Sequence, residues 1–377
     1  MHRILVVLWH PQEDALSAGG FRRTCEILQR FPKDFGKLEI IDAAPSYMEP
    51  FSRDDITIHP YSVPKWITGM RGSLFPLGRV LEWFWSVRQI IRIGKKLRGS
   101  YDYIYVPYSE IFVTAYPAVI LKKISKAHLV MCNLNSTTNP VWRWLMNRWH
   151  NYADTVMTIS NSLAKQLHEQ GITGDFPINY TGLDVGFIKQ QPAQKRIYDA
   201  IFVGRHVPEK GIEEYLKLLP AMVKEKPDFT LVSIGSRAPA IEQYIQKTLR
   251  KAGLEKHWVY KGIVSEEEKY ALISQSKVMW FLSHQEGWGI VPQEALACGT
   301  FPLCYSLPVY KESIAQCPAA TFVKEGDWPA LERAASKLLH MSEATAKPLR
   351  THGKKFVEQF DWEAIAKKEF AIITNTT

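Results

Sequence analysis

The stretch that decides the fold is YDAIFVGRHVPEKGIEEYL, residues 198–216. An apolar run ends at Val203, a short polar loop follows Gly204, and a helical pattern begins after Gly211. That pattern repeats apolar residues at the spacing of one helix face, namely Ile212, Tyr215, Leu216, Leu219 and Val223. A strand that passes through a glycine-containing loop into a helix is the repeating unit of α/β proteins with parallel sheets.

The same alternation runs through the sequence on both sides of a polar linker at 189–196. Before the linker, the runs expected to form strands are 3–9, 38–43, 55–61, 102–108, 128–134, 153–160 and 177–183. After the linker, they are 199–204, 229–235, 258–262, 277–283 and 300–306. Strands separated by helices of ten or more residues imply crossover connections and parallel pairing. We therefore predict two Rossmann-like domains, residues 1–190 and 197–358, followed by a helix within 359–377.

The composition is that of a globular protein from a reducing compartment. Apolar residues make up 46% of the 377-residue chain and charged residues 23%. The five cysteines are odd in number and lack the spacing of a metal site. No apolar run approaches the ~18 residues of a membrane span. The N-terminal apolar run is followed at once by Glu13 and Asp14, which is typical of a first strand and not of a signal peptide. We expect a cytoplasmic protein.

The loop at 204–211 places two cations, Arg205 and Lys210, between a strand end and a helix start. In doubly wound sheets, ligands bind outside the carboxyl ends of the strands, where helix N-termini offer unpaired N–H groups. An arginine fork and a lysine point charge add what a diphosphate needs. The plainer alternative is a solvated loop whose cations pair with neighbouring acids, namely Glu209, Glu213 and Glu214. The loop alone does not decide between the two.

The segment 277–306 combines a strand, a glycine loop, a helix and a second strand. Its loop and helix start are EGWGIVPQE, from Glu286 to Glu294. Pro292 suits a first helical turn, Gly299 suits a C-terminal cap, and Glu294 would complement the helix dipole. None of these structural roles accounts for Glu286, which lies on a loop with exposed amides. Amides flanked by two carboxylates suit a ligand that carries both phosphates and sugar hydroxyls.

Two further loops at strand ends are weaker signals. Gly262 to Val264 follow a strand, where a nucleobase could stack or bond to the backbone, and a capping box at 265–268 starts the next helix. Gly19 and Gly20 follow the first strand and would let backbone approach a ligand. A glycine pair in that place is often only a turn.

Together these motifs resemble the retaining GT-B-fold glycosyltransferases that use nucleotide sugars, the group 1 or family 4 type. The matching positions are the glycine pair Gly19-Gly20, the GR…KG loop from Gly204-Arg205 to Lys210-Gly211, and the glutamates Glu286 and Glu294 within EGWGIVPQEALACGTFP. Their order and spacing cover nearly the whole chain, and 286–302 is the most specific part.

The resemblance implies two Rossmann-like domains whose parallel sheets face each other across a cleft, with the helix in 359–377 crossing back to the first domain. It implies transfer of a hexose-type sugar, with retention, from a nucleotide diphosphate sugar to a hydroxyl of a glycan or lipid-linked acceptor. The departing phosphate would act as base. No cofactor and no metal ion are implied, because the loop cations and helix N-termini would stabilise the diphosphate.

The resemblance also implies roles for individual residues. Arg205 and Lys210 would bind the donor diphosphate and stabilise the leaving nucleotide as its charge grows. Glu286 would face the transferred sugar and position it, and Glu294 would accept from the ribose hydroxyls. The remaining implied donor contacts are Gly19, Gly20, Gly204, Gly262, Val264, Gly287, Trp288, Gly289 and Ile290.

One departure concerns the sugar pocket. Many relatives have a histidine after a first-domain strand, whereas this chain has VMCNLNST at 130–137, so Asn133 or Asn135 would make that sugar contact. Two alternatives stay open. A nucleotide-sugar-binding scaffold without turnover would be expected to lose some of the loop charges, which are complete here. A dinucleotide oxidoreductase would need G-x-G-x-x-G after the first strand, which is missing.

The net charge of +9 comes from one segment of the chain. Residues 51–150 hold 14 basic and 5 acidic residues, whereas the rest holds 33 of each sign. Within it, 62–98 is also rich in aromatic residues such as Trp83 and Trp85. Apolar residues recur there at helical spacing, namely Leu77, Leu81, Phe84, Val87 and Ile91. Cations recur at a similar spacing, namely Arg88, Arg92, Lys95 and Lys96. We favour a peripheral helix on an anionic membrane surface over a core helix with snorkelling cations. No nucleic-acid motif accompanies the patch, so we expect no nucleic-acid partner.

Overall fold

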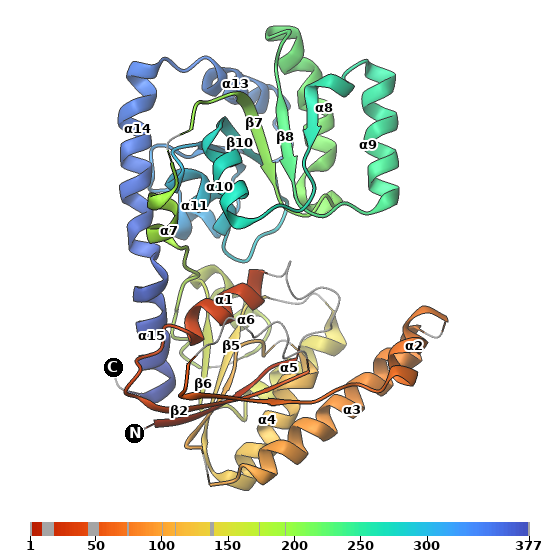
Figure 1. Ribbon diagram of the computed structural model, residues 1–377, viewed down its shortest axis with the longest axis vertical. Coiled ribbons are helices and arrows are strands. Elements are labelled where there is room, and N and C mark those ends of the chain that lie inside the picture. The colour runs from red at the N-terminus through yellow and green to blue at the C-terminus, as the bar shows by residue number, and fades with distance from the viewer. Residues whose placement is uncertain are drawn as a thin grey trace. The chain divides into compact units, whose positions relative to one another are not determined.

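The computed structural model describes residues 2–9, 19–43, 53–73, 75–99, 101–109, 111–135, 139–172, 174–192 and 194–375. The chain forms two compact units, Met1–Thr181 with Trp362–Thr377, and Gly182–Asp361 (Figure 1). Each unit is a parallel sheet with helices packed on it, so the predicted α/β class is confirmed.

The first unit contains a six-stranded sheet in the order β3-β2-β1-β4-β5-β6, with every neighbouring pair parallel. Its strands are β1 (His2–Val7), β2 (Gly36–Asp42), β3 (Ile56–Pro60), β4 (Tyr103–Val106), β5 (His128–Asn133) and β6 (Thr155–Thr158). Its helices are α1 (Gly19–Leu28), α2 (Lys65–Ser73), α3 (Phe75–Lys96), α4 (Phe112–Ser125), α5 (Pro140–His150), α6 (Asn161–Glu169) and α15 (Trp362–Thr374). Ile4 to Val7 of the central strand are fully buried, as expected for a strand covered on both faces.

The second unit contains a sheet in the order β12-β11-β10-β7-β8-β9, again parallel throughout. Its strands are β7 (Tyr198–Val203), β8 (Leu231–Ile234), β9 (Trp258–Tyr260), β10 (Ser276–Phe281), β11 (Phe301–Tyr305) and β12 (Thr321–Val323). Its helices are α7 (Val185–Gln190), α8 (Ile212–Glu225), α9 (Pro239–Ala252), α10 (Glu266–Ser274), α11 (Ile290–Ala297), α12 (Tyr310–Ser313), α13 (Trp328–Leu339) and α14 (Glu343–Phe356). Short 3-10 helices lie at Pro208–Lys210, Glu255–His257 and Val357–Phe360.

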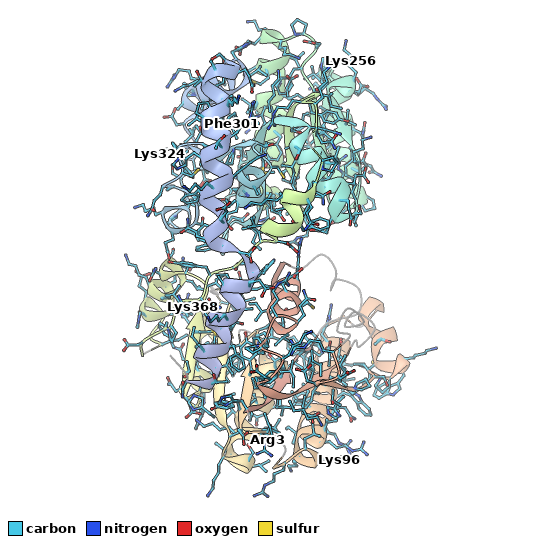
Figure 2. All side chains as sticks on the ribbon, turned by 60° about the vertical axis from the view of Figure 1, so that its left-hand side comes forward. Arg3, Lys96, Lys256, Phe301, Lys324 and Lys368 are labelled. Carbon is cyan, nitrogen blue, oxygen red and sulfur yellow. The ribbon has the colours of Figure 1, made fainter. Side chains whose placement is uncertain are left out.

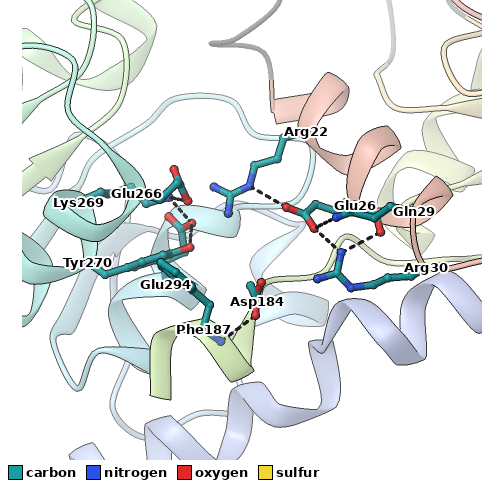
Figure 3. Close-up of polar contacts among 10 residues, drawn as sticks. All are labelled: Arg22, Glu26, Gln29, Arg30, Asp184, Phe187, Glu266, Lys269, Tyr270 and Glu294. Atoms are coloured by element: carbon teal, nitrogen blue, oxygen red, sulfur yellow. Dashed lines mark hydrogen bonds and ion pairs between the residues drawn. The ribbon is translucent and has the colours of Figure 1, made fainter. Parts of the chain in front are cut away.

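The chain passes between units at slightly different places from those predicted. The predicted first domain ran to 190, but α7 belongs to the second unit, where it packs on α11 and on the 3-10 helix Val357–Phe360. The Asp184 side chain caps α7 by accepting from the Phe187 N–H at 2.8 Å (Figure 3). Residues 359–361 also belong to the second unit, so the final helix of the first unit begins at Trp362.

The run at 177–183, expected to be a strand, forms only isolated bridges, one of them from Ile178 to Thr158. The Asn179 N–H still donates to the Thr158 carbonyl at 2.9 Å, but its side chain turns to α15 and donates to Glu369 at 2.7 Å. The apolar alternation was a correct sign of burial, but here the segment is buried against a helix instead of within the sheet.

Candidate active site at the strand ends of the second unit

The loops that follow β7 and β10 lie against each other at one edge of the second sheet. In the sheet, β8 and β9 lie on one side of β7, whereas β10, β11 and β12 lie on its other side. The strand order therefore reverses between β7 and β10. The carbonyl of Glu209 accepts from the His284 N–H at 3.0 Å and from the Ser283 hydroxyl at 3.2 Å. Such reversals are where open α/β sheets bind ligands. This topology unites two motifs that are far apart in sequence.

Gly211 is required for this close approach of the two loops. It has φ +81°, ends the 3-10 helix Pro208–Lys210 and starts α8. A Cβ at this position would lie 2.4 Å from the carbonyl oxygen of Leu282, a separation that side chains do not tolerate. The glycine of the predicted GR…KG loop is therefore fixed by both its backbone conformation and its contact with the β10 loop.

Lys210 and Glu286 meet across these loops. The Lys210 Nζ lies 2.5 Å from Glu286 Oε1, and the two side chains keep 21% and 12% of their exposure, so ligands and solvent can still reach the pair. The alternative in which the cations pair within their own loop and helix is not what the structure shows. Glu213 instead accepts from the Tyr244 hydroxyl at 2.8 Å, and Glu214 lies 3.5 Å from His284.

Arg205 is the uncommitted cation of the site. It is exposed directly after Gly204, and among the residues that the structure describes its guanidinium has no hydrogen-bond or ionic partner. The planar guanidinium can therefore bind an anionic ligand without first breaking an existing contact.

Glu294 is held by two side chains that the sequence did not single out. It lies in α11, only 3% exposed, and its Oε1 accepts from Lys269 Nζ at 2.8 Å and from the Tyr270 hydroxyl at 3.0 Å (Figure 3). Lys269 also bridges to Glu266 at 2.9 Å, three residues earlier on α10. In the sequence, the three-residue spacing of Glu266 and Lys269 indicates only an ion pair on the surface of α10. Nothing near Lys269 in the sequence predicted its contact with Glu294.

The start of α11 presents backbone to the site. Its first residue is Ile290, and the preceding Gly289 adopts φ +87° without a side-chain cap. A Cβ on Gly289 would lie 2.6 Å from the Tyr310 ring, so glycine is needed here as well. Gly287 is partly exposed. The Trp288 side chain is 3% exposed, donates to Gln293 at 3.2 Å and meets the Phe360 ring edge-on. The side chain therefore packs in the unit's interior, which leaves the backbone N–H of this residue as its predicted donor contact.

The β9 loop lies at the same carboxyl edge. Gly262 has φ +73° and accepts from the Gly235 N–H at 2.8 Å, and Val264 is half-buried. One of the two hydrogen bonds of the predicted capping box is confirmed, since the Ser265 hydroxyl accepts from the Glu268 N–H at 3.2 Å.

His206 is a buried polar residue beside Arg205 that the sequence analysis missed. Both ring nitrogens lack a hydrogen-bond partner among the described residues, and the ring packs edge-on against Phe202 and Tyr260. Burial, with the nearby Arg237 charge, lowers the pKa of His206 to about 4, so the imidazole is neutral at pH 7. Arg237 stacks 3.7 Å above the Tyr260 ring.

The four predicted site residues of the first unit share the carboxyl edge of its sheet. Gly19 and Gly20 are the first residues of α1 and not a loop, and a Cβ on Gly20 would lie 2.9 Å from the Tyr108 ring. Asn133 ends β5 fully buried, accepts from the Asn135 N–H at 3.1 Å, and keeps an Nδ2 without a partner among the described residues. Asn135 is exposed.

Residues 187–356 match the family model of glycosyl transferases group 1. This match places the second unit with the group 1 glycosyltransferases by similarity. The match spans both charged loops and α11, which are the parts of the second unit that form the candidate site.

The curated relatives of the chain are distant. It is 25% identical over 184 residues to the GDP-mannose:cellobiosyl-diphosphopolyprenol alpha-mannosyltransferase of Xanthomonas oryzae pv. oryzae, covering 49% of this chain and 48% of that protein. It is 24% identical over 239 residues to the phosphatidyl-myo-inositol mannosyltransferase of Mycobacterium leprae, covering 62% of each. The alignment thus spans about half the length of the first of these relatives.

Solved structures resemble the whole chain. Anabaena HepE in complex with UDP and glucose superposes with a TM-score of 0.75 at 15% identity, covering 100% of both chains. A glycosyltransferase from Rickettsia africae ESF-5 gives 0.78 at 16% identity, covering 100% of this chain and 99% of that one. At such identities the likeness shows the fold, and it confirms the predicted GT-B fold.

Proposed function

We propose that the chain is a retaining, metal-independent glycosyltransferase that moves a hexose-type sugar from a nucleotide diphosphate sugar to a hydroxyl of a glycan or lipid-linked acceptor. The observation that carries the proposal is the Lys210–Glu286 pair at the reversal of strand order in the second sheet. A cation and a carboxylate held there, partly exposed, can be separated by a ligand that offers a phosphate to one and hydroxyls to the other.

The diphosphate would be bound by Arg205 and Lys210. Charge grows on the leaving nucleotide in the transition state, and two preplaced cations stabilise that charge more strongly there than in the bound donor. Backbone N–H groups from Gly287 to Ile290 would add dipoles at the same place, because α11 begins there without a side-chain cap. This arrangement supports a reaction that needs no metal ion.

The sugar and ribose would be bound by the two glutamates. Glu286, released from Lys210, would accept from sugar hydroxyls and position the oxocarbenium-like transition state. Glu294 would accept from the ribose while Lys269 and Tyr270 hold its carboxylate in place. In the retaining mechanism of the family, the departing phosphate takes the proton of the incoming hydroxyl, so neither glutamate need act as a nucleophile.

The relatives favour a lipid-linked acceptor among the acceptors predicted. Two of them are named for mannosyl transfer to a diphosphopolyprenol or to a phosphatidylinositol, and the HepE structure holds UDP with glucose. Among the described residues, no helix is both long and apolar enough to cross a bilayer. An enzyme with such an acceptor would work at a membrane surface, and the segment 62–98 is the predicted contact.

The test of this proposal is the fate of a nucleotide sugar. We expect one donor of a panel of UDP-, GDP- and ADP-sugars to stabilise the protein against heat and to release its nucleoside diphosphate when acceptor is added. Proton NMR of the product should show the anomeric configuration of the donor, and excess EDTA should leave the rate unchanged. Inversion or abolition by EDTA would contradict the mechanism, and thermal stabilisation without turnover would favour the non-catalytic scaffold.

A further inference from the structure

The helix α3 in the first unit exposes three large apolar side chains, Leu77, Val80 and Phe84, and buries small and polar residues beside Val87 and Ile90. The residues turned inward are spaced by four along the helix, namely Gly78, Glu82, Ser86, Ile90 and Gly94, and of these Glu82 is 1% exposed and Ser86 fully buried. Leu77 and Phe84 are 52% and 65% exposed. A helix that only covered a core would bury such large apolar side chains and expose Glu82 and Ser86.

The buried glycines explain how the neighbouring helices pack so closely on α3. A Cβ on Gly94 would lie 2.5 Å from Leu121 of α4, and one on Gly78 would lie 3.0 Å from Met70 of α2. The Trp85 indole also donates to the Ser62 carbonyl at 3.0 Å, which attaches the segment before α2 to α3. The orientation of α3 is therefore set by close packing on its small face, and its apolar face is left outward.

The outward face divides into an apolar half and a basic half. Four of the eleven exposed large apolar side chains among the described residues lie within 66–84, namely Trp66, Leu77, Val80 and Phe84. Further along α3, Arg88, Arg92 and Lys95 are exposed. Lys96, the last residue of the helix, is exposed as well (Figure 2). None of these four cations has a carboxylate partner among the described residues. We call this set of eight residues the α2–α3 face.

We propose that the α2–α3 face binds an anionic lipid bilayer, with Trp66, Leu77, Val80 and Phe84 entering the headgroup–acyl boundary and Arg88, Arg92, Lys95 and Lys96 contacting lipid phosphates. Charge selects this occupant, because a second copy of the chain would bring the same cations together, whereas an anionic surface complements them. Exposed apolar side chains next to unpaired cations are also the two kinds of group that a headgroup–acyl boundary binds. The identity of the acceptor rests on the proposed function, but the binding does not.

The test is flotation of the full chain with vesicles of phosphatidylcholine containing phosphatidylglycerol, compared with pure phosphatidylcholine. The chain should float with anionic vesicles only, and added salt should weaken binding by screening. Neutralising Arg88, Arg92 and Lys95 to Gln should weaken partitioning roughly fivefold per charge, so on the order of a hundredfold together. Phe84→Ser should weaken it by roughly tenfold or more.

A matched control separates this face from general surface hydrophobicity. Trp66 and Trp144 are 58% and 57% exposed, on α2 and α5 of the same unit. Trp66→Ser should reduce flotation, whereas Trp144→Ser should not. Equal effects of the two, equal binding to both vesicle types, or a Phe84-dependent dimer in sedimentation with no vesicle binding would each overturn the proposal. Glu286→Gln should float like the wild type, so a failed transferase mechanism would leave this result standing.

Discussion

Each unit holds glutamates paired with cations, and the two sets of pairs differ in access. In the first unit, Glu369 of α15 is fully buried and bonds Arg23 of α1, the Tyr105 hydroxyl and the Asn179 amide. In the second unit, the Lys210–Glu286 pair at the strand ends keeps part of its exposure. The same chemistry therefore joins a terminal helix to a sheet in one place and leaves a pair that a ligand can exchange in the other. Accessibility, more than residue type, indicates which pair is structural.

The largest expected effect is on stability, from the buried cluster. Removing one partner leaves an uncompensated buried charge, so Glu369→Ala should lower the free energy of unfolding by roughly 3–5 kcal/mol. The matched control is Glu26 on α1, whose side chain is 18% exposed and whose contacts with Arg22, Arg30 and Gln29 are therefore partly open to solvent (Figure 3). Glu26→Ala should cost at most about 1 kcal/mol in urea denaturation. Equal losses would remove the distinction between buried and accessible pairs.

The next effect is on transfer, from the accessible pair. Lys210→Ala should reduce kcat/KM by roughly 10²–10³, because a cation that stabilises the leaving group is lost, while the melting temperature changes little. Lys226 offers a control in the same unit, since it pairs at 2.8 Å with Asp199, which lies at the amino end of β7 and not at the carboxyl ends of the strands. Lys226→Ala should leave transfer kinetics unchanged. A similar loss in both variants would mean that Lys210 acts only through the fold.

A smaller effect should appear with pH at His206, which is buried without a hydrogen-bond partner among the described residues. Its pKa is about 4 in the folded chain and about 6.5 when unfolded. Between these values the unfolded chain binds a proton that the folded chain does not, so the contribution to stability is present above pH 6.5 and is lost as pH falls towards 4. The loss at pH 5 is about 2 kcal/mol. His206→Leu should show a smaller decrease in unfolding free energy from pH 7 to pH 5, and an unchanged decrease would contradict the assignment.

The smallest expected effect is on donor affinity, from Glu294. A glutamine keeps the shape but weakens acceptance from the ribose, so Glu294→Gln should raise the dissociation constant of the nucleoside diphosphate by about tenfold, measured by calorimetry. The rate at saturating donor should fall much less. A large loss in kcat with unchanged affinity would move Glu294 from donor binding to the chemical step.

The sequence predicted the order of elements and the positions of the loops better than the partners of the side chains. Gly211 and Gly289 were predictable because each meets a backbone requirement visible in its own loop. Lys269 and Tyr270 were not, because their contact with Glu294 depends on how α10 packs beside α11. The burial of the Trp288 side chain was not predictable either, because it depends on how Phe360 packs beside it. On α3, helical spacing was recognised, but which face is buried followed from Gly78 and Gly94.

The most direct test of the central claim, that the Lys210–Glu286 pair is the centre of a sugar-transfer site, is the turnover of Glu286→Gln beside the wild type. Nucleoside diphosphate release should be followed at saturating nucleotide sugar and acceptor, with thermal stabilisation by the same donor as a measure of binding. We predict that the variant keeps its stability and its donor-induced stabilisation but turns over roughly 10²–10³ times more slowly. Near-wild-type turnover by Glu286→Gln would contradict the account.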